Sequence, residues 1–144
     1  MALGDDSDQA SSASEAGDAP VGVVRARARA SGRIRMLPET ARAVAANEMK
    51  KGDVLGAARF AGRQGAKEAA SYLPLSDPEW VGRITIDFAV GEDAIEVTAS
   101  VESESDVGAR VRALSAVTVA TLTIYDMCKA ADRTMEIGPV VALD

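Results

Sequence analysis

The sequence predicts an α+β fold in which an antiparallel sheet packs on helices. The expected order is β-α-β-β-α-β, with an extra helix after the first strand. Three patterns predict it: an alternating stretch near the N-terminus, a later pair of alternating stretches around a tight turn, and helical stretches between and after them. At 144 residues the chain fits one domain with a real core.

The first strand is expected over residues 23–36, where two kinds of side chain alternate. One parity is basic and consists of Arg25, Arg27, Arg29, Arg33 and Arg35. The other parity is small and apolar and consists of Ala26, Ala28, Ala30, Ile34 and Met36. A strand with this pattern has one basic face and one buried face. The basic face is either a solvated or paired surface, or a wall that faces an anion.

Two helices are expected next. Pro38 suits the first turn of a helix that runs to about Met49. After a turn at residues 50–53, Asp53 is a candidate cap for a second helix from Val54 to about Tyr72. That helix carries a surface of small residues that favours close packing, formed by Ala57, Ala58, Ala61, Gly62, Ala66, Ala69 and Ala70.

A hairpin and a long helix complete the pattern. Apolar residues alternate over 84–90 and again over 95–101, on either side of a Gly-Glu-Asp turn. A helix is expected over residues 111–131 and a final strand over residues 136–142. Without the extra helix this order is the split-βαβ, or ferredoxin-like, arrangement. Residues 1–19 are acidic and nearly free of bulky apolar side chains, so we expect a disordered tail before a single domain at 20–144.

Composition narrows the functional classes. The net charge of −6 argues against nucleic-acid binding, and the absence of histidine argues against a zinc site or a Ser-His-Asp triad. We therefore expect no metal and no cofactor. The single cysteine, Cys128, fits a reducing compartment. The acidic N-terminus lacks the apolar stretch of a signal peptide, and the Thr-rich stretch 114–125 is too short to span a bilayer, so we expect a cytoplasmic protein without membrane contact.

Aromatic residues make up only 3% of the chain, and alanine and valine fill their place. Small side chains bury little area each, and burial contributes about 25 cal/mol per Å². We therefore expect subunit interfaces to supplement a thin core.

The stretch 122–138 holds the clearest candidate for chemistry. Asp126 and Lys129 are three residues apart on the expected helix and share a face. The pair is either a surface ion pair or an acid–base pair with shifted pKa values, and spacing alone favours the ion pair.

Three blocks carry a resemblance to a known family: KGDVLGAARFAG, ALSAVTVATLTIYDM and YDMCKAADRTMEIG. They resemble the cyclic pyranopterin monophosphate synthase family, also known as molybdenum cofactor biosynthesis protein C, and the match runs over residues 23–143. The resemblance implies a ferredoxin-like fold and a dimer-based hexamer with sites at dimer interfaces. It also implies conversion of a cyclised GTP derivative into cyclic pyranopterin monophosphate with release of pyrophosphate.

By the same resemblance, Lys51, Asp126 and Lys129 are catalytic positions, and Lys67 is retained as a substrate-binding position. The resemblance reverses the preference at Asp126 and Lys129, which we expect to be a functional pair.

Two departures from the family pattern affect the expected site. Residues 75–78 read Leu-Ser-Asp-Pro where the family has Leu-Cys-His-Pro, so Asp77 replaces a histidine and lies beside Ser76. Arg110 and Arg112 replace two glutamates near a helix N-terminus, where the macrodipole disfavours cations. Their counter-charge is either a nearby carboxylate (Glu102, Glu104 or Asp106) or a ligand phosphate or carboxylate. We expect Ser76, Asp77, Arg110 and Arg112 to bind substrate.

These departures lead to three functional hypotheses. The first is a diverged enzyme that uses Lys51, Asp126 and Lys129 for a cyclisation or rearrangement of a different anionic small molecule. The second is the family's own reaction with an altered site. The third is a non-catalytic binding module or partner subunit. We favour the first because the central catalytic positions are kept while the positions around them are rebuilt.

Overall fold

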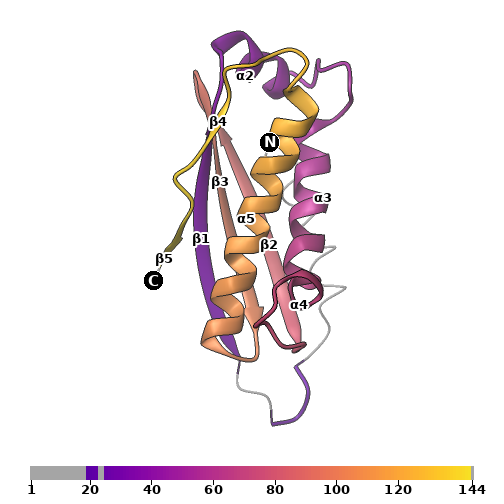
Figure 1. Ribbon diagram of the computed structural model, residues 1–144, viewed down its shortest axis with the longest axis vertical. Helices are drawn as coiled ribbons and strands as arrows, with labels where there is room; N and C mark the ends of the chain where they lie inside the picture. The colour runs from indigo at the N-terminus through magenta and orange to yellow at the C-terminus, as the bar shows by residue number, and fades with distance from the viewer. Residues whose placement is uncertain (1–18, 23–24, 144) are drawn as a thin grey trace.

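The computed structural model describes residues 19–22 and 25–143. The acidic tail expected over residues 1–19 therefore lies, except for Ala19, outside the described residues. Figure 1 shows a sheet with two long helices on one of its faces.

The sheet is antiparallel and mixes long and short strands. Its strand order is β2-β3-β1-β4, and β5 pairs with β1 beside β4. The strands are β1 (Ala26–Arg35), β2 (Val81–Val90), β3 (Ala94–Ser103), β4 (Glu136–Ile137) and β5 (Val141–Leu143). This order confirms the expected ferredoxin-like α+β fold.

The helices are α2 (Pro38–Ala45), α3 (Val54–Lys67), α4 (Ala69–Tyr72) and α5 (Asp106–Cys128). α3 and α5 lie side by side over the sheet, and α2 and α4 lie at opposite ends of α5 (Figure 1). Asp53 caps α3 as expected, because its carboxylate accepts the N–H of Gly56.

Most element bounds differ by a few residues from those expected, and four differences stand out. α2 ends at Ala45, shortly before Asn47, which has a φ of 56°. The second expected helix is divided into α3 and α4, because the chain leaves helical geometry at Glu68. α5 begins at Asp106, five residues early, because the Ser105 hydroxyl accepts the N–H of Gly108. The expected last strand divides into β4 and β5 around Pro139, which has no N–H to donate.

The two faces of β1 have the characters expected from the alternation. Ala30 and Ile34 are fully buried, while the arginines of the other parity are exposed. Cross-strand carboxylates pair with most of these arginines: Glu102 with Arg25 and Arg27, Glu96 with Arg33, and Glu136 with Arg35. The basic row is therefore mainly a paired, solvent-facing surface.

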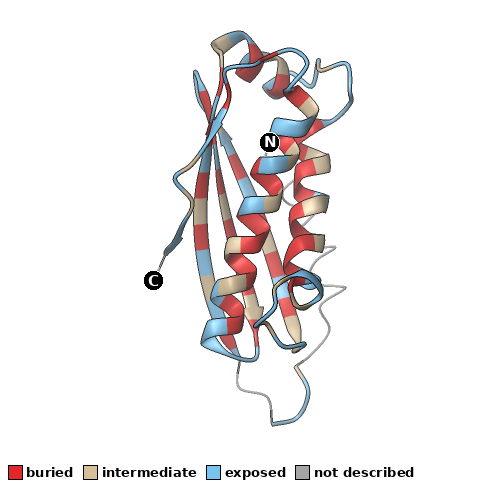
Figure 2. Cartoon of the chain, viewed as in Figure 1, coloured by how far each residue is buried: buried red, intermediate tan, exposed pale blue. Residues whose placement is uncertain are grey.

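The core lies between the sheet and the helix pair α3–α5 (Figure 2). It consists largely of alanine, valine and isoleucine, as the composition suggested. Glycine makes the closest helix approach possible. A Cβ built at Gly62 would lie 2.8 Å from the carbonyl oxygen of Ala116 and 2.7 Å from Cδ1 of Ile86.

Gly62→Ala is therefore expected to lower the free energy of unfolding by about 1–3 kcal/mol, because α3 must move away from α5. Urea denaturation measures this change. Gly91→Ala is the matched control, because a Cβ there meets nothing closer than 3.4 Å. Equal denaturation midpoints for the two variants would contradict a close contact between the helices at Gly62.

Among the described helices, α5 alone is long and apolar enough to cross a membrane by length and composition. In its most apolar window, with a mean hydropathy of 1.3, 56% of the residues are buried inside the fold. α5 therefore has the burial of a core helix in this structure.

A buried carboxylate fastens the loop after α5 to the junction between β1 and α2. Asp132 is 2% exposed and accepts the N–H of Leu37 at 2.8 Å. It also accepts the N–H and the hydroxyl of Thr134 at 2.8 and 2.7 Å. Burial acts to raise the pKa of Asp132, but these hydrogen bonds and one from Thr40 outweigh it and hold the pKa below its usual range.

Candidate functional site

The first cluster of candidate residues lies where α5 ends. The ammonium Nζ of Lys129 is 2.6 Å from Oδ1 of Asp126 and also donates to the Asp126 carbonyl oxygen at 3.0 Å. The hydrogen bond from Lys129 lowers the pKa of Asp126, and the charges of Lys129 and Lys51 lower it further. The structure thus brings together the three residues expected to be catalytic.

The surroundings of this cluster are open and partly apolar. Lys51 lines a pocket of about 400 Å³ with Met49 and Met127, while Asp126 and Lys129 line a second pocket of about 480 Å³. Both side chains of the ion pair are more than half exposed. Two ammonium groups beside a carboxylate can hold phosphate oxygens and pass a proton between groups.

The neighbouring cysteine is not a candidate nucleophile. Cys128 is fully buried. Burial raises the pKa of its thiol, and the charge of Asp132 raises it further. The thiol is therefore protonated and inaccessible near neutral pH.

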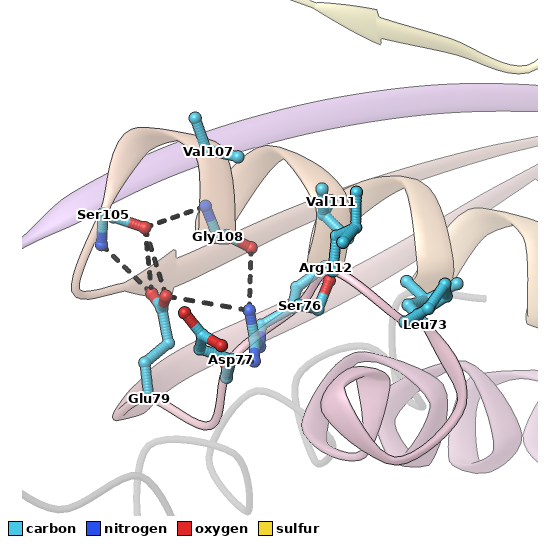
Figure 3. Close-up of a pocket in the computed structure, with 11 residues that line it drawn as sticks. Leu73, Ser76, Asp77, Glu79, Ser105, Val107, Gly108, Val111 and Arg112 are labelled. Carbon is cyan, nitrogen blue, oxygen red and sulfur yellow. Dashed lines mark hydrogen bonds and ion pairs between the residues drawn. The ribbon is translucent and has the colours of Figure 1, made fainter.

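The second group of candidates lies at the other end of α5. A pocket of about 520 Å³ lies between the loop after α4 and the start of α5, and Ser76 and Asp77 line it (Figure 3). The Asp77 side chain is exposed, and among the described residues its carboxylate has no hydrogen-bond or ion-pair partner.

Arg112 is the largest of the fully buried side chains, with 1% of its surface exposed. Its guanidinium donates to the carbonyl oxygens of Asp77 and Gly108 at 3.0 and 3.3 Å. Its closest carboxylate is Glu79, 4.0 Å away. Its Nε is buried and has no hydrogen-bond partner in the described structure.

The carboxylate beside Arg112 is therefore Glu79, and not Glu102, Glu104 or Asp106, which the sequence offered as one of two alternatives. The Glu79 carboxylate also accepts the N–H groups of Glu104 and Ser105 at 2.9 and 3.1 Å and the hydroxyls of Ser103 and Ser105. It lies against Gly108, where any Cβ would overlap it. These hydrogen bonds and the contact with Gly108 thus hold the Glu79 carboxylate beside the first turn of α5 (Figure 3).

Glu79 was not among the predicted site residues. The sequence alone gives no signal for it, because the burial of Arg112 and its approach to Glu79 appear only in the folded chain. Burial acts to raise the pKa of Glu79, but the hydrogen bonds from Ser103, Ser105 and Glu104 outweigh it and lower the pKa.

This lowered pKa predicts the sign of a pH effect. A carboxyl group with a lower pKa in the folded state stabilises the fold above its unfolded pKa, and that contribution is lost as pH falls through the folded pKa. We expect the free energy of unfolding to decline below about pH 5 and to decline less steeply in Glu79→Gln. Urea denaturation over a pH series measures both slopes, and equal slopes would show that Glu79 does not titrate with folding.

The two remaining candidates, Lys67 and Arg110, lie near the pocket of about 520 Å³ but do not line it. Lys67 lines an adjoining groove of about 440 Å³ together with Glu79 and Arg112. Arg110 is exposed on α5, and among the described residues it makes no hydrogen bond or ion pair. Lys67, Ser76, Asp77 and Arg112 therefore gather at one end of the helix pair.

A single chain does not bring the candidate residues at the start of α5 close to those at its end. Arg112 and Lys129 are 17 residues apart along α5, and a helix rises about 1.5 Å per residue, so the groups are about 26 Å apart. α4 marks one end of this span and α2 the other (Figure 1). In the described part of the chain, no three His, Cys, Asp or Glu side chains are grouped as metal ligands.

Comparison with known proteins gives consistent results. Residues 22–144 match the MoaC family. A molybdenum cofactor biosynthesis bifunctional protein of Chlorobaculum tepidum is 47% identical over 81% of this chain, and the aligned part is 37% of that protein. Cyclic pyranopterin monophosphate synthases of Roseiflexus sp. (strain RS-1) and Roseiflexus castenholzii are 44% and 41% identical over 77% and 76% of this chain, and over 72% and 70% of their own lengths.

Proposed function

The chain belongs to the MoaC family, and on that premise we propose that it is a lyase-type enzyme that forms cyclic pyranopterin monophosphate for molybdenum cofactor synthesis. The observation that carries this proposal is the cluster of Lys51, Asp126 and Lys129. It stands in a chain that is 41–47% identical to relatives named for that pathway.

The cluster suits a reaction on a triphosphate that ends with release of pyrophosphate. The ammonium groups of Lys51 and Lys129 stabilise the negative charge that develops on phosphate oxygens. Asp126 fixes the position of the Lys129 ammonium at 2.6 Å, so that this ammonium can donate a proton to the substrate. Lys67 and Arg110 are further candidates for contacts with the anionic part of the substrate.

The separation of the two groups supports a homo-oligomer. A small-molecule substrate does not span about 26 Å along one helix, so a complete site takes Lys51, Asp126 and Lys129 from one copy and the other group from its neighbour. Exposed apolar side chains near both groups suit such an interface: Leu75 and Val107 at one end, Leu122 and Tyr125 at the other. We propose a cytoplasmic, dimer-based hexamer.

The hypothesis of a different substrate receives no support from the comparisons, which favour the family's own reaction. It remains the second candidate because Asp77 and the buried Arg112 stand where the resemblance places a histidine and a glutamate. The partner-subunit hypothesis has no observation of its own in its favour.

Incubation of the purified, assembled protein with the cyclised GTP derivative tests the proposal. We expect pyranopterin and pyrophosphate to form in equal amounts. If an assembled protein forms neither product, the proposal is wrong, and the search turns to other anionic small molecules.

A further inference from the structure

α3 carries a row of cations along one side. Arg59, Arg63 and Lys67 are spaced by four residues, so they lie on the same face of the helix. The two arginines are 7% and 8% exposed, so their charges are largely withdrawn from solvent, whereas Lys67 is exposed. The row concentrates three positive charges along about 12 Å of helix.

Arg59 ties this row to the outer edge of the sheet. β2 is the end strand of the described sheet, and α3 packs against it. The Nε of Arg59 donates to the carbonyl oxygen of Ile86 in β2 at 2.9 Å, and its guanidinium lies 5.0 Å from the centre of the Phe88 ring. We call the row and the outer edge of β2 beside it the basic edge.

The positive charge of Arg59 is held at a cost. Burial lowers the pKa of its guanidinium, and the charge of Asp87 on β2 opposes this lowering only in part. A further carboxylate at the basic edge would therefore reduce the cost of holding the charge there.

Residues 1–18, which we call the acidic segment, have the opposite charge. They contain no lysine or arginine, and without them the net charge of the chain would change from −6 to −1. Little apolar surface is available in such a composition, so binding by this segment has to be electrostatic. Its five carboxylates belong to Asp5, Asp6, Asp8, Glu15 and Asp18.

The acidic segment is long enough to reach the basic edge. Residues 19–22, where the described chain begins, lie at the same end of the molecule as α4, which follows α3 directly (Figure 1). Eighteen extended residues span up to about 60 Å, several times the length of the row. The outer arginines of β1 are a weaker target, because cross-strand glutamates already pair with most of them.

We propose that the acidic segment binds along the basic edge, with its carboxylates beside Arg59, Arg63 and Lys67. The bound segment covers the outer edge of β2, which would otherwise offer backbone N–H and C=O groups to another chain. The binding does not depend on the proposed function. On that function, however, Lys67 is a candidate contact for the anionic substrate, so the segment and the substrate compete there.

A zero-length carbodiimide cross-link tests the contact, because it joins a carboxylate to an amine only when the two touch. Lys67 lies at the basic edge, whereas the other lysines, Lys50, Lys51 and Lys129, lie near the end of α5. In the full-length protein we expect mass spectrometry to find the acidic segment joined mainly to Lys67. About 1 M NaCl should suppress this cross-link, because it shortens the Debye length to about 3 Å.

Two variants and a matched control identify the charges. Arg63→Gln, and a triple variant with Asp5→Asn, Asp6→Asn and Asp8→Asn, should each lower the yield of this cross-link by about threefold or more. Arg29→Gln removes an exposed cation from β1 and should leave the yield unchanged. Circular dichroism confirms folding, and the triple variant decides the result if Arg63→Gln does not fold.

Three results would overturn the inference: no cross-link to Lys67 at low salt, cross-links mainly to Lys51 or Lys129, or equal yields at Lys67 in wild type and the triple variant. On the proposed function, the triple variant should also have a KM lower by about twofold or more. An equal KM would exclude the competition. A charge-dependent cross-link in a protein that forms no pyranopterin would count against the proposed function and leave the binding of the acidic segment standing.

Discussion

Lys129→Ala is expected to lower kcat for pyranopterin formation by about 10²–10⁴-fold. The variant loses an ammonium group that the Asp126 carboxylate holds at 2.6 Å. On the proposed function, this group is a proton donor and a positive charge near the phosphates. The fold should tolerate the change, because the ion pair is more than half exposed and such pairs contribute about 0–1 kcal/mol. Steady-state kinetics and a urea denaturation series measure the two quantities on the same preparation.

Arg133→Ala is the matched control, since it removes an exposed cation four residues further along the chain. It should leave kcat within about twofold of wild type. Lys129→Arg separates charge from proton transfer, because arginine keeps the charge but does not release a proton near neutral pH. A Lys129→Ala enzyme with wild-type kcat would remove Lys129 from the catalytic group.

Asp132→Ala is expected to lower the free energy of unfolding by about 3 kcal/mol or more. The carboxylate is 2% exposed and satisfies the N–H groups of Leu37 and Thr134 and the Thr134 hydroxyl. Its removal leaves buried donors without partners and frees the loop after α5 from the start of α2. Denaturant midpoints measure the loss.

Asp93→Ala, at an exposed position in the β2–β3 turn, should change stability by less than about 0.5 kcal/mol. The stability of Asp132→Asn should lie between those of Asp132→Ala and Asp93→Ala, because an amide oxygen still accepts hydrogen bonds. If Asp132→Ala were as stable as Asp93→Ala, the hydrogen bonds of Asp132 would not anchor the loop.

The sequence allowed the sheet to be predicted because its patterns are local. The alternation in β1 and the turn between β2 and β3 follow from period two and turn chemistry, and both are present. The element ends were less predictable, because they depend on single contacts such as the Ser105 cap and the bend at Glu68.

The pairing of Glu79 with Arg112 was missed because it joins residues 33 positions apart that only the folded loop brings together. The separation of the two candidate groups, in contrast, was available from the sequence. The expected helix already contained Arg112 and Lys129, and its rise per residue places them about 26 Å apart.

The length of α5 between the two groups has a genetic consequence. On the proposed shared site, each chain contributes to two different sites, so a chain with a defect at one end of α5 still has an intact opposite end. On this proposal, two variants, one altered at Lys129 and one at Asp77, would each have strongly reduced activity alone. When they are unfolded, mixed equally and reassembled, about a quarter of the sites would combine two intact halves. Such intersubunit complementation would let two damaged copies of one gene sustain activity together.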